Sequence, residues 1–302
     1  MKHSNEKIES ALRVFCMTIG SIPKKHHAPI ALVLGRLWFL FDKRHRDITI
    51  DNLKKAYQPK ENHVETEILA KKVFTNFSRV IFEVCWAMTQ RPENMDVYID
   101  RSDIRFIKEA LKKKKGVLIL TGHLGNWELG PYVPFLEGIK SHAVYRPLDF
   151  KPMDRFVIKM RTRLGAELIP AKNALRKIIT VLRKNEIVGL LIDQDSDPHN
   201  GVVIDFFGRP AFASKGLAII ARQTGAPVVP AFLVRDNERF KFISGPEIPF
   251  VRTGDPQKDI EINTQRYNLA IENAVRQYPE QWFWVHRRWK TKVSSPWPRQ
   301  ST

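Results

Sequence analysis

The stretch VLILTGHLGNWELG (residues 117–130) places a short apolar run directly before a histidine, with a glutamate five positions further on. Further apolar or β-branched runs, bounded by glycine, proline or polar residues, lie at 142–146, 186–193, 227–234 and 239–246. Helical patterns lie at 126–138, 151–164, 172–184, 214–224 and 257–277. This alternation predicts an α/β fold with a mostly parallel central sheet covered by helices. The 239–246 run is expected to pair with its predecessor as a hairpin.

The helical patterns within residues 1–92 predict an N-terminal helical region, followed by an α/β domain over 93–302. We expect the two parts to form one continuous globular unit. The apolar stretches 11–22 and 28–41 are interrupted or bounded by charge. Neither reaches the roughly 20 apolar residues of a spanning helix. We expect at least one of them to lie at a membrane interface. Ordinary buried helices of a soluble domain are the alternative.

Composition favours an anionic partner. The chain has 302 residues, 43% of them hydrophobic, and a formal net charge of +18. That charge suits nucleic acid, an anionic membrane surface, or an acidic protein or substrate. The segment WFWVHRRWK (282–290) mixes aromatic residues with cations, as nucleic-acid-stacking and membrane-interface segments do. No recognised nucleic-acid-binding motif accompanies it, so no nucleic acid is expected.

Neither a disulfide nor a metal site is expected. Cys16 and Cys85 stand in apolar helical surroundings without paired spacing, which predicts buried free thiols. The acidic run DQDSDPHNG (193–201) has Pro198 where a calcium loop of the EF-hand type needs glycine, and Ile204 where it needs glutamate. A loop that closes over the site is the preferred interpretation of this run.

His123 follows a predicted parallel strand, at the sheet edge where ligands bind in α/β folds. A neutral imidazole is a common general base, and a carboxylate on its other ring nitrogen would fix the tautomer. Positions five apart do not share a helix face, so a turn through Gly122, Gly125 and Asn126 has to bring Glu128 to His123. We expect the two side chains to meet at the mouth of an apolar groove. A structural histidine beside an unrelated surface glutamate is the alternative.

No protein nucleophile is evident, because the chain lacks a G-x-S-x-G motif and neither cysteine is close to His123 in sequence. The substrate itself is therefore expected to supply the hydroxyl. Asn126 is also expected to cap the helix predicted to follow.

Several segments, in order, resemble the bacterial lipid A late acyltransferases, the lauroyl and myristoyl transferases. The pentad GHLGNWE is similar to their H-x-x-x-x-E signature. The other similar segments are ITIDNLKKAY, VYRP, MRTRLGAELIP, GLLIDQD with GVVIDFFGRPAFASKGLAIIARQTGAPVVPAF, and PEQWFWVHRRWK.

The resemblance implies a membrane-associated O-acyltransferase of the glycerolipid acyltransferase type, on the cytoplasmic face of the inner membrane. The acyl donor would be acyl carrier protein or coenzyme A, with no further cofactor, and the acceptor a hydroxyl of a lipid A precursor. By the family pattern His123 is the base and Glu128 its partner, while Arg161 and Asp193 occupy matching functional positions.

The remaining site residues are assigned by chemistry. Arg146 and Arg161 suit phosphate binding, and Gln194 adjoins Asp193. The amides from Gly122 to Gly125, or an arginine, can stabilise a developing oxyanion. A monomer is expected. The alternatives are an acyltransferase for another glycolipid or a lysophospholipid, and a non-catalytic basic adaptor for membrane or carrier protein.

Overall fold

The central sheet has seven strands in the order β1-β9-β8-β2-β5-β3-β4 in the computed structural model, which describes residues 2–57 and 63–293. The β8–β9 pair is antiparallel and the other neighbouring strands are parallel, so the predicted mostly parallel sheet and its hairpin are confirmed. The strands are β1 (Ile99–Asp100), β2 (Val117–Thr121), β3 (Ser141–Tyr145), β4 (Ala166–Pro170), β5 (Ile187–Leu191), β8 (Val228–Asp236) and β9 (Arg239–Ser244). A separate hairpin joins β6 (Gly201–Phe206) to β7 (Arg209–Ser214).

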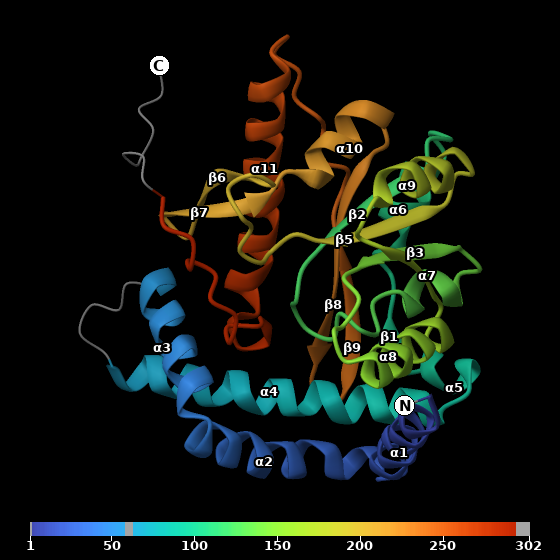
Figure 1. Cartoon of the computed structure of the whole chain (residues 1–302), viewed down its shortest axis with the longest axis vertical. Helices are drawn as coiled ribbons and strands as arrows, with labels where there is room; N and C mark the ends of the chain where they lie inside the picture. The colour runs from blue at the N-terminus through green and yellow to red at the C-terminus, as the bar shows by residue number, and fades with distance from the viewer. Residues whose placement is uncertain (1, 58–62, 294–302) are drawn as a thin grey trace.

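Helices cover both faces of the sheet (Figure 1). Side chains of Leu118, Leu120 and Val188 pack in one hydrophobic cluster with α9 (Ala174–Arg183), α10 (Gly216–Thr224) and α11 (Pro256–Gln277). The opposite face, which includes Val117 and Ile187, packs in a second cluster with α6 (Ile104–Leu111), α7 (Tyr132–Leu136) and α8 (Lys151–Arg163). The alternation follows from the strand period of two, which turns successive side chains to opposite faces.

The N-terminal helices contribute to both clusters. They are α1 (Lys2–Gly20), α2 (His27–Phe41), α3 (Lys43–Tyr57), α4 (His63–Thr89) and α5 (Pro92–Asp96), with a 3-10 turn (Lys24–His26) before α2. In Figure 1, α4 lies along the bottom of the molecule with α2 beneath it. Phe39, Leu53 and Phe74 join the first cluster, and Cys16 and Val80 join the second. A boundary at residue 92 stays a prediction, but hydrophobic packing crosses it.

Several details differ from expectation, and two of them have a clear cause in the sequence. The predicted helix over 126–138 is wrong, because residues 127–131 form turns and only Tyr132–Leu136 is helical. Gly130 and Pro131 interrupt the pattern there, and both residues favour turns. Strand β4 was not expected as a separate element, since its five residues AELIP carry only a weak alternating pattern. Cys16 and Cys85 are free and buried, as predicted.

Candidate active site

The turn after β2 requires glycine. Gly125 has φ +65°, and a Cβ added there would stand 2.1 Å from the Leu233 carbonyl oxygen. Its amide donates to the Gln281 carbonyl at 3.0 Å. A Cβ on Gly122 would in turn come within 2.9 Å of the Asp193 carboxyl carbon. The two glycines therefore let this turn pack against β8 and against the loop that follows β5.

His123 is oriented by Asp193. Its Nδ1 lies 2.9 Å from Asp193 Oδ1, and its backbone amide donates to Asp193 Oδ2 at 2.7 Å. Trp282 Nε1 donates to the same Oδ2 at 2.7 Å. An ionised carboxylate is only an acceptor, so Nδ1 carries the proton and the lone pair lies on Nε2. His123 is thereby held in the tautomer that a general base needs.

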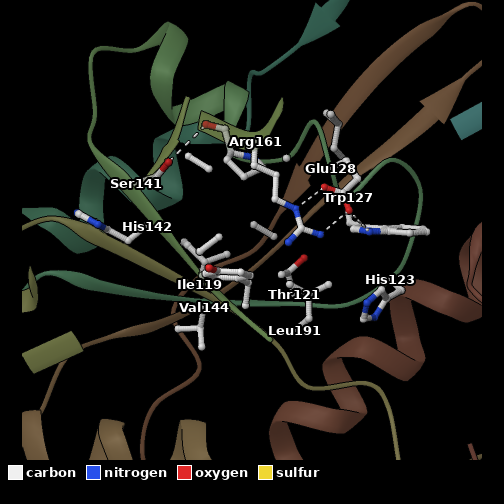
Figure 2. A pocket seen from close by; sticks show the side chains of 18 of the residues that line it. Ile119, Thr121, His123, Trp127, Glu128, Ser141, His142, Val144, Arg161 and Leu191 are labelled. Carbon is white, nitrogen blue, oxygen red and sulfur yellow. Dashed lines mark hydrogen bonds and ion pairs between the residues drawn. The ribbon is translucent and has the colours of Figure 1, made fainter. Parts of the chain in front are cut away.

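The expected contact between His123 and Glu128 is wrong. Both Glu128 oxygens instead bind Arg161, with Arg161 Nε and Nη2 each at 2.7 Å from one of them (Figure 2). Trp127 Nε1 donates to Glu128 Oε1 at 3.2 Å. The turn between His123 and Glu128 does bring both residues to the same cavity, but the Glu128 side chain points toward α8. The carboxylate that reaches His123 Nδ1 is that of Asp193, on the loop after β5.

Electrostatics differ between the two ion pairs. Burial alone would raise the pKa of the Asp193 carboxyl, but the adjacent His123 charge and the hydrogen bonds from His123 and Trp282 lower that pKa to about 2. Burial alone would lower the pKa of Arg161, and the Glu128 carboxylate more than reverses this effect. Asp193 is therefore a permanent anion at neutral pH, and Arg161 a permanent cation.

Four amides of the turn, from His123 to Asn126, already donate within the protein. His123 N binds Asp193, Leu124 N binds the Gly122 carbonyl, and the amides of Gly125 and Asn126 bind Gln281 and Leu233. Asn126 also does not cap a helix: its side chain is fully buried and donates to Glu83 on α4 at 2.9 Å. Asn126 fastens the turn to α4. Of the predicted donors, the Gly122 amide and the arginines therefore remain.

A cavity of about 750 Å³ opens beside His123, between the sheet and helices α6, α7 and α8. Arg146, Arg161, Gln194 and Glu128 line it together with His123. Asp193 does not; it is 1% exposed and acts behind the histidine, so its expected role in binding substrate is corrected to an orienting one. Figure 2 shows the Arg161 guanidinium between Glu128 and Thr121, over the cavity.

Sequence reasoning missed the closing block as part of the site. Trp282 binds Asp193, and the Phe283 amide donates to the His123 carbonyl at 3.0 Å. The Phe283 and Trp127 rings flank the imidazole at 5.9 and 5.2 Å between centroids. Trp282 and Trp284 are 2% and 0% exposed, so these two rings are not available to a membrane interface. The repeated tryptophans were the available signal, since buried indole N–H groups need acceptors.

No cluster of three or more His, Cys, Asp or Glu side chains suited to a metal ion occurs in residues 2–57 or 63–293. The charged and polar side chains that line the cavity include two arginines, the Gln194 amide, the His123 imidazole and the carboxylates of Glu128, Asp149 and Asp154. Such a set can bind phosphate or carbonyl oxygens and accept a proton.

Comparison with known proteins agrees with this chemistry. The profile of the family described as "Bacterial lipid A biosynthesis acyltransferase" matches residues 1–291. The chain belongs to this family. As a lipid A acyltransferase family member, it is an O-acyltransferase and therefore an enzyme.

Three relatives illustrate the range of this acyltransferase family. Lipid A biosynthesis lauroyltransferase and palmitoleoyltransferase of Escherichia coli (strain K12) are each 27% identical, and each match covers 86% of this chain and 83% of the relative. Phosphatidylinositol mannoside acyltransferase of Mycolicibacterium smegmatis is 26% identical over 65% of this chain and 64% of its own length.

Proposed function

We propose that this acyltransferase moves a fatty acyl chain from an acyl carrier protein thioester to a hydroxyl of a lipid A precursor. The supporting observation is the His123–Asp193 pair at the mouth of a largely apolar cavity. His123 Nε2 removes the acceptor hydroxyl proton as the oxygen attacks the thioester carbonyl. The carbon–sulfur bond then breaks, and the imidazolium returns its proton to the departing thiolate. No covalent acyl-enzyme is formed.

The arginines have two tasks in this reaction. Arg161 lies over the cavity with Glu128 holding two of its nitrogens, so its remaining donors can face the developing oxyanion or an acceptor phosphate. Arg146 lies exposed on the loop after β3 and lines the same cavity. Guanidinium groups suit phosphate, which both a lipid A precursor and a phosphopantetheine arm carry.

The exposed apolar side chains of α2 support the proposal that the protein associates with a membrane. Leu32, Val33, Leu37, Leu40 and Phe41 are 40–76% exposed on this helix. Arg36, Lys43 and Arg44 lie exposed among or beside them. No helix in residues 2–57 and 63–293 has the length and hydropathy to cross a membrane. We therefore infer interfacial binding to an anionic surface, on the cytoplasmic face of the inner membrane where acyl carrier protein is present.

Purified protein in mixed micelles tests the reaction, with lauroyl-carrier protein, lauroyl-coenzyme A and a lipid A precursor as substrates. Transfer should require His123, and His123→Ala should lose at least roughly 10³-fold in kcat/KM. Unchanged transfer by His123→Ala would overturn the proposed base.

Mass spectrometry of lipids from a deletion strain tests the acceptor. The proposal predicts lipid A that lacks one acyl chain. Intact lipid A together with a phospholipid or mannoside that lacks a chain would favour the acceptor class of the mycobacterial relative instead.

A further inference from the structure

The cavity follows the strand direction along one face of the sheet. Its floor is formed by alternate residues of three strands: Ile119 and Thr121 on β2, Ile187, Gly189 and Leu191 on β5, and Ser141, Ala143 and Tyr145 on β3. Alternate residues share a sheet face. The strand pairings Thr121–Leu191, Ile119–Gly189 and Ser141–Ile187 place these residues in successive rows.

The two ends of the cavity differ. The row of Thr121 and Leu191 adjoins His123, while the row of Ser141 and Ile187 lies at the amino ends of the strands. The side chains at the inner end, those of Ile107, Ser141, Ala166 and Ile187, are 1–5% exposed. Four residues of parallel strand separate the rows of Leu191 and Ile187, a distance of about 13 Å. The cavity is thus an apolar slot closed at the end away from the base.

Gly189 occupies the middle of this floor. A Cβ added there would meet no atom within 4 Å except the His142 carbonyl oxygen, at 3.7 Å. Its neighbours in the same row are Ile119 and Ala143. Glycine in a strand interior is unfavourable for the strand and often marks the close approach of a ligand. The missing side chain leaves the slot continuous from mouth to end.

We propose that Gly189 sets the acyl-chain length this enzyme accepts, with Ile187 as the inner stop. The inference rests on the proposed function, because it takes the slot as the site of the transferred chain. A zigzag of carbon–carbon bonds of about 1.5 Å advances roughly 1.3 Å per carbon, so the 13 Å floor accommodates about ten carbons. A side chain at 189 would exclude about half of them.

The test is a chain-length profile. Acyl-carrier proteins with chains of 4 to 16 carbons are supplied to wild type, Gly189→Ala and Gly189→Val, and kcat/KM is measured for each. Each methylene group that can no longer be buried lowers kcat/KM about fourfold. Gly189→Val should therefore move the optimum roughly five carbons shorter, with a loss on the order of 10³-fold for long chains and little loss for the shortest. The optimum chain length of Gly189→Ala should lie between those of wild type and Gly189→Val.

Two further variants exclude general damage. Gly216→Val, at the start of α10, gains a Cβ that meets only Ser214 Oγ at 3.5 Å, and it should keep the wild-type profile. Ile187→Val deepens the slot by about one carbon and should shift the optimum toward longer chains. Opposite shifts from two substitutions on one strand cannot arise from instability.

A binding assay separates this inference from the proposed function. Saturated fatty acids of the same lengths are titrated, with the fluorescence of Trp127, which lines the cavity, as the readout. Suppose that the wild type transfers no acyl chain and still binds fatty acids with a preferred length that is shorter in Gly189→Val. In that case the role of Gly189 stands and the proposed acyl transfer is wrong. Equal losses at all lengths, an unshifted profile, or no fatty-acid binding would overturn the role of Gly189.

Discussion

The carboxylate that serves His123 can be identified by replacing Asp193 with asparagine. In the wild type, His123 N and Trp282 Nε1 both donate to Oδ2. In Asp193→Asn these two donors hold the amide oxygen at the Oδ2 position, so the amide NH₂ faces His123 Nδ1. An N–H that points at Nδ1 can bond only to its lone pair, so the imidazole proton moves to Nε2 and the base is lost.

The size of the effect follows from the same contacts. The pKa of Asp193 is lowered from 3.8 to about 2, which corresponds to roughly 2–3 kcal/mol of interaction favouring the ionised carboxyl. Loss of the correct tautomer in a comparable histidine–carboxylate pair lowers kcat by about 10⁴. We expect a loss of that order in kcat/KM for acyl transfer. Nitrogen-15 NMR of labelled histidine should show the proton on Nδ1 in wild type and on Nε2 in Asp193→Asn.

Glu128→Gln is the matched control, since it converts the carboxylate that lines the cavity to an amide, as Asp193→Asn does for the buried carboxylate behind His123. It should release Arg161 and weaken acceptor binding, raising KM, while His123 keeps its Nδ1 proton. A tautomer change in Glu128→Gln but not in Asp193→Asn would refute the reasoning.

Three other outcomes are expected. Because the folded pKa of Asp193 lies below its ordinary value, the stabilisation by the ionised carboxylate is fully present above about pH 4 and declines toward pH 2. In urea unfolding, the free energy of unfolding should differ between wild type and Asp193→Asn by a constant amount from pH 5 to 8, and this difference should disappear on acidification. A difference that grows toward low pH would contradict this. Gly125→Ala should lower the free energy of unfolding by more than about 3 kcal/mol, because Gly125 has φ +65° and the new Cβ would stand 2.1 Å from the Leu233 carbonyl oxygen. Gly208→Ala, whose Cβ would meet no atom within 4 Å, should lower it by only about 1 kcal/mol. Equal losses in thermal melts would show that the protein relieves the contact with Leu233. Leu40→Glu with Phe41→Glu should reduce sedimentation with anionic vesicles at least tenfold without lowering the melting temperature, whereas unchanged binding would place the membrane surface elsewhere.

The sheet was predictable because most of its strands are short apolar runs bounded by glycine, proline or polar residues. Residues 117–122 and 186–193 differ from β2 and β5 by only a residue or two at each end. The position of His123 followed from the rule that ligands bind at strand carboxyl ends. Local pattern was enough for these features.

The partner of His123 was not predictable in the same way. Asp193 was recognised as a site residue, but its hydrogen bond spans 70 positions and depends on two strands being neighbours, β2 and β5, that are not consecutive in the chain. Glu128 is nearer in sequence, and Arg161 on α8 competes for it with two bonds. Spacing cannot show which of two nearby N–H donors, on His123 or on Arg161, a carboxylate will bind.

The dependence of the site on Trp282 and Phe283 has a consequence for biosynthesis. Asp193 and the His123 turn are translated early, yet their fixed arrangement needs donors 89 positions after Asp193. A chain that has been synthesised only to residue 280 lacks both donors. The arrangement around His123 is therefore fully assembled only after Trp282 and Phe283 have left the ribosome.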